Sequence, residues 1–453
     1  MTARRHHLFY DLSLIAILVA FVFLCHSSYG QTTSSNSESN WAQWRGPFGT
    51  GAALDSANPP LEWNESTNIR WKKELPGLGH STPIVWGNRI YVTTAIPVGE
   101  EMEPRYSGAP GAHDNLPVTQ EHEFVVIAID RKTGNIEWKK TVARKLPHEG
   151  AHYTGSLASA SSATDGQRIY AYFGSYGLYC LDTNGKLVWE KDLGKMNTKH
   201  GHGEGSSPYL FGDSLAVNWD HEADSFIVVL DKRTGKERWR QVRDEVTSWS
   251  SPIVVEHQGV AQLIVAGTKA VRSYDLKNGE VIWECGGLSA NVVATPVAAD
   301  GMVYVGSSYD TKAMMGIRLA GAEGDITDTD NVVWSRRQRT PYVPSPLLYQ
   351  GDLYFLAHYQ GILSRVTGAT GDEPTPPMRL NGIRNTYASP VAAKGHLMIT
   401  SLEGVTLVVT AGKIPRIVSI NRLDDSFGAS AAIVDDSIIL RGRKYLYCIG
   451  KPQ

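Results

Sequence analysis

The feature that most constrains this chain is a repeat that recurs eight times, mostly at intervals of 41–50 residues. Three copies are "SSPYLFGDSLAVNW", "ATPVAADGMVYVGS" and "PSPLLYQGDLYFLA". Each copy has an apolar run, a short turn rich in Gly, Asn or Asp, and a run of alternating β-branched and aromatic residues, which is the pattern of an antiparallel hairpin. The copies are anchored at Pro83, Ser162, Pro208, Pro252, Pro296, Pro346, Pro390 and Ala431.

A second half-repeat follows most of these hairpins and predicts two more strands. "AIDRKTGNIEW", "CLDTNGKLVW", "VLDKRTGKERW" and "SYDLKNGEVIW" each contain an Asp, a Thr-Gly or Asn-Gly turn and a Trp. The tryptophans, interpreted as anchors that pack one sheet on the next, are Trp138, Trp189, Trp239, Trp283 and, without the preceding pattern, Trp334. Four strands in each unit at this period predict an all-β fold, an eight-bladed β-propeller with four antiparallel strands in each blade.

The two ends of the repeat region predict how the propeller closes. The last unit, residues 429–450, supplies only three strands, whereas "IRWKKEL" at residues 69–75 is a strand without a unit of its own. We therefore expect the N-terminal strand to complete the last blade, which removes free sheet edges. The propeller is expected to span residues 68–453. Blades six and seven lack the Trp.

The first thirty residues predict a secretory signal peptide. Arg4 and Arg5 precede an apolar run from Leu12 to Cys25, and small residues follow at Ser28 and Gly30. The run is shorter than the roughly 20 residues of a membrane span, although an uncleaved anchor or a lipid on Cys25 is an alternative. Residues 31–67 are assigned to a polar linker and an N-terminal lead-in. The sequence thus predicts export to the periplasm or the medium, with no transmembrane span after cleavage.

Composition narrows the class of partner. The net charge is −2, and 42% of the residues are hydrophobic, which supports a large core and argues against a nucleic-acid partner. Cys180, Cys285 and Cys448 remain after cleavage and form no C-x-x-C motif, so we interpret them as buried strand thiols. We expect a monomer.

The repeats resemble the pyrroloquinoline-quinone-like (PQQ-like) β-propeller family, whose docking pattern of Ala-x-Asp, Thr-Gly and Trp is close to "AIDRKTGNIEW". The segments "WAQWRGPFGTG", "GLGHSTPIVW" and "RLDDSFGASAA" look like those of secreted PQQ-binding-like propeller proteins of planctomycetes. The resemblance covers nearly the whole mature chain. It implies a fold but no particular function, because one fold hosts many sites.

Two relatives that share this scaffold imply different activities. Quinoprotein alcohol dehydrogenases hold their quinone with a vicinal cysteine disulfide, a calcium bound by Glu and Asn, and an Asp base; this chain has no Cys-Cys pair, and no matching Glu, Asn and Asp set is recognisable by motif. Assembly lipoproteins of the BamB type use propeller loops to hold a protein partner. PQQ is therefore a cofactor implied by the resemblance alone.

The histidines gather in loops of one face. In a propeller, the loop before the first strand and the loop between strands two and three emerge on the same face, and nine histidines fall in such loops: His80, His113, His122, His148, His152, His200, His202, His221 and His358. Two long insertions, residues 97–123 and 143–158, open on that face as well. His257 and His396 fall in turns of the opposite face. We interpret the His-rich face as the functional one.

Two candidate sites lie on this face. Imidazoles and carboxylates are suitable ligands for a divalent transition metal, and the candidate ligands are His200, His202, Glu204 and His221; the alternative is a solvated polar funnel in which these side chains bind loop backbone. An aromatic and basic set at equivalent positions of other blades predicts a cofactor or ligand pocket, with candidate residues His80, Trp249, Asn291, Arg339, Tyr342, Arg384 and Tyr387. Alternatively, Trp249 and Tyr387 plug the channel.

These observations predict an exported binding or scaffold protein rather than an enzyme. Its partner would be an envelope protein, held by the two insertions, or a small-molecule ligand at the central funnel. The alternative hypothesis is an enzyme that uses the same face, either a PQQ-dependent oxidoreductase or a metal-assisted hydrolase. The sequence identifies no catalytic residue.

Overall fold

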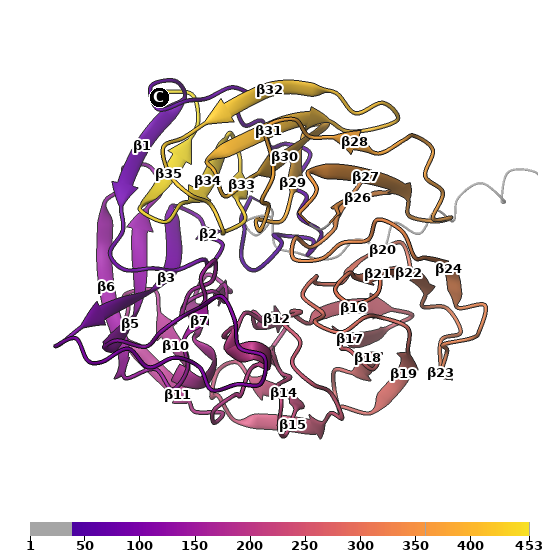
Figure 1. The fold of residues 1–453 in the computed structure, drawn as a ribbon, viewed down its shortest axis with the longest axis horizontal. Helices are drawn as coiled ribbons and strands as arrows, with labels where there is room; N and C mark the ends of the chain where they lie inside the picture. The colour runs from indigo at the N-terminus through magenta and orange to yellow at the C-terminus, as the bar shows by residue number, and fades with distance from the viewer. Residues whose placement is uncertain (1–38, 358, 453) are drawn as a thin grey trace, which may run out of the picture. The chain divides into compact units, whose positions relative to one another are not determined.

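The computed structural model describes residues 39–357 and 359–452. The predicted signal peptide, residues 31–38 of the linker and His358 lie outside this part. The described residues form eight four-stranded antiparallel units that follow one another around a ring (Figure 1). The predicted all-β, eight-bladed propeller is confirmed.

The strands of the blades run as follows. Blade 1 contains β2 (Ile84–Trp86), β3 (Arg89–Val98), β5 (Glu121–Asp130) and β6 (Ile136–Lys145). Blade 2 contains β8 (Ala163–Thr164), β9 (Arg168–Tyr172), β10 (Leu178–Asp182) and β11 (Leu187–Lys191). Blade 3 contains β12 (Tyr209–Phe211), β13 (Ser214–Trp219), β14 (Phe226–Asp231) and β15 (Glu237–Val242). Blade 4 contains β16 (Ile253–His257), β17 (Val260–Ala266), β18 (Val271–Asp275) and β19 (Val281–Cys285).

The second half of the ring repeats this order. Blade 5 contains β20 (Val297–Ala299), β21 (Met302–Ser307), β22 (Ala313–Arg318) and β24 (Val332–Arg336). Blade 6 contains β25 (Leu347–Tyr349), β26 (Asp352–Leu356), β27 (Ile362–Thr367) and β28 (Met378–Arg379). Blade 7 contains β29 (Val391–Ala393), β30 (His396–Thr400), β31 (Val405–Thr410) and β32 (Ile417–Arg422). Blade 8 contains β33 (Ala432–Val434), β34 (Ser437–Arg441), β35 (Tyr445–Ile449) and β1 (Ile69–Glu74).

Burial along the strands explains their sequence patterns. Strand β13 lies inside its blade and is buried at every position, whereas the outermost strand β15 alternates between exposed and half-buried residues. The inner strand β13 is therefore mostly apolar, whereas the outer strand β15 is mostly polar. Cys180, Cys285 and Cys448 are free and buried in β10, β19 and β35, as interpreted from the sequence.

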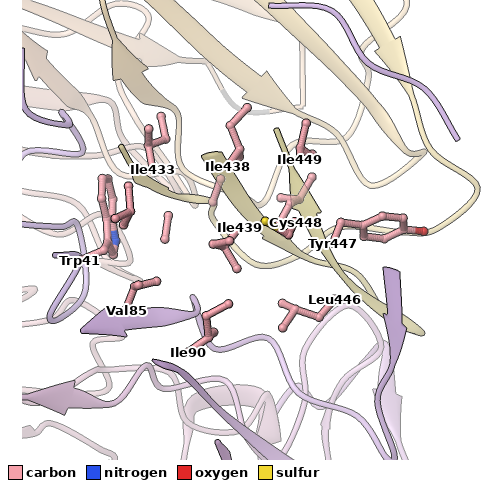
Figure 2. Close-up of a cluster of buried hydrophobic side chains, with 14 of the residues drawn as sticks. Trp41, Val85, Ile90, Ile433, Ile438, Ile439, Leu446, Tyr447, Cys448 and Ile449 are labelled. Carbon is pink, nitrogen blue, oxygen red and sulfur yellow. The ribbon is translucent and has the colours of Figure 1, made fainter. Parts of the chain in front are cut away.

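The ring closes as the sequence predicts. Strand β1 pairs antiparallel with β35, so the earliest strand of the chain completes the last blade, and Figure 1 shows the two side by side. A hydrophobic cluster seals the junction between blade 8 and blade 1; Figure 2 shows Ile439 and Leu446 on the side of Val85 and Ile90, whereas the neighbouring Ile438 points away from them. These side chains are almost completely buried.

The tryptophans dock with the same geometry in most blades, and this explains their spacing from the Gly turns. The indole N–H of Trp138 donates to the carbonyl oxygen of Thr183 in the next blade, and Trp189 does the same to Lys232. A Cβ atom on Gly185 would lie 2.9 Å from the Trp138 ring. Trp71, Trp239 and Trp334 dock on the following blade in the same way. The predicted role of these tryptophans is confirmed.

Trp283 differs in one contact. It lies in a buried cluster with side chains of the next blade, as expected. Its indole N–H, however, donates to Gln262 Oε1 at 3.0 Å within its own sheet, because blade 5 offers a longer turn with the short strand β23 (Gly324–Asp325) beside β19.

The insertions add small elements on the His-rich face. Strand β4 (Asn115–Leu116) pairs with β7 (Ala151–His152) and joins the two insertions. Two short 3₁₀ turns, η1 (Gly174–Tyr176) and η2 (Lys199–Gly201), lie in blade 2 and in the loop before blade 3.

The N-terminal lead-in packs inside the ring. Trp41, 1% exposed, pairs with Val85 of β2, and Ala53 donates to the carbonyl oxygen of Ala392 in β29. Between them, the lead-in also hydrogen-bonds β8, β12 and β25 through Ala42, Gln43 and Thr50. Residues 41–53 therefore satisfy the free backbone groups of five innermost strands.

Candidate functional site

A ring of Ser and Thr side chains encircles the channel where the blades begin. The first strands of neighbouring blades lie in contact. In seven of the eight blades, the Ser or Thr two positions before the first strand accepts a hydrogen bond from the equivalent backbone N–H of the preceding blade. Ser161 N–H donates to Ser207 Oγ, and Ser207 N–H donates to Ser251 Oγ, both at 2.9 Å. The ring consists of Thr82, Ser161, Ser207, Ser251, Thr295, Ser345, Ser389 and Ser430, joined by seven such bonds.

A cavity of about 410 Å³ lies on this ring. Every blade contributes to its lining, with His80, Ser159, Gly205, Trp249, Asn291, Tyr342, Tyr387 and Ser430 as one residue from each. Trp44 of the lead-in closes the inner end of the cavity. The lead-in residues next to Trp44 hydrogen-bond to strand residues that lie three positions after the Ser and Thr residues of the ring, which places Trp44 on the inner side of that ring. The Trp44 indole N–H donates to Thr295 Oγ1 at 3.0 Å.

Five of the seven predicted ligand residues line this cavity: His80, Trp249, Asn291, Tyr342 and Tyr387. The two arginines do not. Arg339 forms an ion pair with Glu373, and Arg384 is exposed and lines a separate small pocket. Trp249 and Tyr387 form walls of the cavity rather than a plug; the lead-in is the plug.

The four predicted metal ligands are not brought together. His200 and His202 line the cavity rim, but Glu204 turns its carboxylate to the backbone N–H and hydroxyl of Ser175. His221 is buried, and its Nδ1 accepts a hydrogen bond from the Asn197 N–H at 3.1 Å. Within residues 39–357 and 359–452, no group of three or more His, Cys, Asp and Glu side chains is placed to hold a metal ion.

His200 and His202 instead join two histidines of the insertions. The ring centroids of His113 and His202 lie 4.8 Å apart, as do those of His152 and His202, and His113 lies 5.1 Å from His200. Asn115 of β4 holds this cluster, since its Nδ2 donates to the His200 carbonyl and its Oδ1 accepts from His202 Nδ1 at 2.8 Å. The insertions are thereby fastened to the loop before blade 3.

Burial favours the neutral forms of His80, His202 and Glu204. It lowers the pKa of His80 to about 3 and that of His202 to about 4, with neighbouring cations and histidines adding to the effect. Burial also raises the pKa of Glu204 to about 8. At neutral pH these imidazoles are uncharged, and the Glu204 carboxyl is mostly protonated.

Aromatic rings form the opposite wall. Tyr309 and Tyr342 stack with ring centroids 6.1 Å apart, and the hydroxyls of Tyr359 and Tyr387 lie 2.6 Å apart. The Trp249 indole N–H donates to the Gly203 carbonyl at 2.7 Å, which fixes the ring against the wall. The cavity therefore has imidazoles on one side, tyrosines on the other and indoles at its base and wall.

Several residues that line the cavity were not predicted from the sequence. Trp44 precedes the repeats, so no periodicity pointed to it. Tyr309 and Tyr359 lie in loops between the second and third strands of their blades; the same topological rule that placed the histidines could have found them.

Comparisons with known proteins support the fold. The protein BamB from Moraxella catarrhalis superposes with a TM-score of 0.51 and 14% identity, covering 78% of this chain and 98% of that one. The quinohemoprotein alcohol dehydrogenase from Comamonas testosteroni has a TM-score of 0.62 and 10% identity, covering 93% of this chain and 82% of that one. A computationally designed protein, Ika8, has a TM-score of 0.50 and 12% identity, covering 83% of this chain and 99% of that one. At these identities the likeness concerns the fold alone.

The cavity does not fit the quinone that the fold family implies. PQQ carries three carboxylates, which require cationic partners or a bound metal ion. Among the described residues that line the cavity there is no Lys or Arg. The three described cysteines lie in separate blades and offer no vicinal pair.

No curated protein matches the chain. In the described part of the chain, no helix is long and apolar enough to cross a membrane.

Membership of the chain in a family follows from its sequence match. The family model described as outer membrane protein assembly factor BamB matches residues 60–205 and 223–450. The chain therefore belongs to this family of PQQ-like β-propellers.

Proposed function

We propose that this protein is an exported binding protein that takes a small, uncharged organic molecule into its central cavity from the His-rich face. The observation that carries the proposal is the cavity itself. All eight blades line it, Trp44 closes its base, and its volume falls in the range of about 300–1,000 Å³ that small-molecule sites occupy.

The charge of the lining supports an uncharged ligand. Lys and Arg side chains are absent from the described lining, Asp114 and Glu204 are its acidic residues, and the pKa of Glu204 is raised to about 8. An anionic ligand would lose its hydration there without gaining a cationic partner, which costs several kcal/mol. A neutral molecule avoids this cost.

Export is part of the proposal. The basic residues, apolar run and small residues of the first thirty positions support it. The intact mass of the protein recovered from an exporting host tests it. Loss of about thirty residues is the expected result, and a full-length mass or an added lipid would contradict it.

Filling the cavity tests the binding function. Purified protein, incubated with a small-molecule extract and measured by native mass spectrometry, should carry a bound molecule. Val343 lines the cavity, so Val343→Trp should abolish that mass shift. Val418, which is 43% exposed on the outer strand β32, offers a matched control, Val418→Trp. Equal binding by both variants, or none by the parent protein, would refute the proposal.

A protein partner is the second candidate. The insertions expose large apolar side chains at one face, and these are Met102, Tyr106, Leu116, Leu146 and Tyr153, each at least 38% exposed. Such side chains gathered on one face are typical of interaction sites. Capture of an envelope protein that is lost in Tyr106→Ser but retained in Val343→Trp would assign this role to the insertions.

A further inference from the structure

We infer that the molecule bound in the cavity is a neutral saccharide of one or two rings. This inference rests on the proposed binding function and names its ligand class. It follows from how the lining divides hydrogen-bond donors, hydrogen-bond acceptors and aromatic faces.

The base of the cavity presents hydroxyl donors. Ser161, Ser207, Ser345 and Ser389 each accept one backbone N–H, and all four line the cavity. Within the described residues, no acceptor is found for the hydroxyl protons of Ser207, Ser345 and Ser389. A ligand that reaches the ring therefore meets several O–H donors, which call for oxygen acceptors.

The wall presents acceptors. His113 Nδ1 lies 2.8 Å from the Gly111 carbonyl, so it carries the proton, and His202 Nδ1 donates to Asn115 Oδ1. The Nε2 atom of the neutral His202 ring is thus a lone-pair acceptor. Asn291 is 3% exposed, and its buried Oδ1 has no hydrogen-bond partner among the described residues. These atoms call for O–H donors.

A saccharide satisfies both requirements and also matches the aromatic walls. Its hydroxyls donate and accept, and its C–H faces pack on flat rings such as those of Trp249, Tyr342 and Tyr387. A purely apolar ligand would leave the Ser hydroxyls and the Asn291 Oδ1 unpaired, which costs about 1–3 kcal/mol for each buried group. The lack of Lys and Arg in the described lining disfavours sugar phosphates and uronic acids.

The test is isothermal titration calorimetry of the mature protein with glucose, galactose, mannose, cellobiose and maltose, beside glucuronate and glucose 6-phosphate. We expect at least one neutral sugar to bind, and the charged analogues to bind about tenfold more weakly or not at all. Preferential binding of a charged analogue would overturn the inference.

Matched variants locate the binding. His202→Ala should weaken sugar binding about tenfold, since one buried hydrogen bond is lost. His396→Ala, at a half-buried histidine that begins β30 on the opposite face, should leave it unchanged. An equal effect of both variants would place the sugar outside the cavity and refute the inference.

The two proposals fail separately. If no sugar binds but the extract still yields a bound neutral molecule that Val343→Trp removes, the saccharide assignment is wrong and the binding function stands. If neither sugar nor extract yields a bound molecule, both are wrong.

Discussion

The backbone N–H of Ser161 donates a hydrogen bond to the Oγ of Ser207 at 2.9 Å, although the two residues lie 46 positions apart. Each lies two positions before the first strand of its blade. Because the same bond recurs between six further pairs of neighbouring blades, it links the blades at the base of the cavity. The repeat thus supplies one polar contact at seven of the eight junctions, in addition to the apolar packing.

Removing one hydroxyl from this ring should lower stability. In Ser207→Ala, the buried N–H of Ser161 loses its acceptor, and we expect the free energy of unfolding to fall by about 1–3 kcal/mol. Urea denaturation followed by tryptophan fluorescence measures the change. Ser66→Ala, at an exposed position with local contacts only, should change stability much less; an equal loss in both would show that the ring contributes nothing of its own.

The Trp138 and Gly185 contact predicts a second stability difference. Gly185 has φ 81°, and an added Cβ would lie 2.9 Å from the Trp138 ring, whereas Gly212 has φ 54° and open space at that point. Both Gly→Ala variants are destabilised because an alanine is placed on left-handed backbone. Gly185→Ala should therefore be the less stable by about 1–3 kcal/mol, the cost of overpacking. Equal melting temperatures would mean that the indole moves aside freely.

Arg45 predicts how much the lead-in contributes. Its guanidinium is 2% exposed and donates to the carbonyl oxygens of Pro390, Thr50 and Pro346 at 2.9–3.1 Å. Arg45→Met should lower the free energy of unfolding by about 2–4 kcal/mol, because these buried carbonyls lose a charged donor. Arg233→Met, at a side chain that is 63% exposed, is the control. A similarly small effect in both variants would show that Arg45 does not hold the lead-in inside the ring.

The fold was predictable because the local sequence of each repeat specifies its own turns and strands. A tight turn and a Trp recur in most units, and "IRWKKEL" supplies the strand that the last unit lacks. The path of residues 41–53 was not predictable, since it depends on backbone groups of five separate blades and not on any pattern of its own.

The site was predictable in its location and not in its contacts. Propeller topology places His80, His200 and His202 on one face, and the structure brings them to one cavity. The direction of the Glu204 side chain depends on Ser175 in the preceding blade, and the neighbours of His202 come from the insertions. Such contacts between distant loops leave no trace in residue spacing.

Glu204 predicts how stability depends on pH. Burial raises the pKa of its carboxyl from 4.5 to about 8 in the folded protein, so the folded state binds a proton that the unfolded state releases above pH 4.5. The resulting stabilisation is complete below the unfolded pKa and is lost as the pH rises towards the folded one. Stability should therefore fall between pH 5 and pH 8, by up to about 1.4 kcal/mol for each unit of the pKa difference.

Glu204→Gln isolates this contribution, because glutamine keeps the shape of the side chain and does not titrate. Urea midpoints measured at pH 5, 6, 7 and 8 should decline less steeply in the variant than in the parent protein, and the two should differ most at pH 8, where the parent carboxyl has begun to lose its proton. Glu256→Gln, at an exposed position on β16, should retain the parent slope. Parallel curves for Glu204→Gln and the parent would mean that the Ser175 N–H and hydroxyl stabilise the Glu204 carboxylate enough to keep its pKa near the ordinary value.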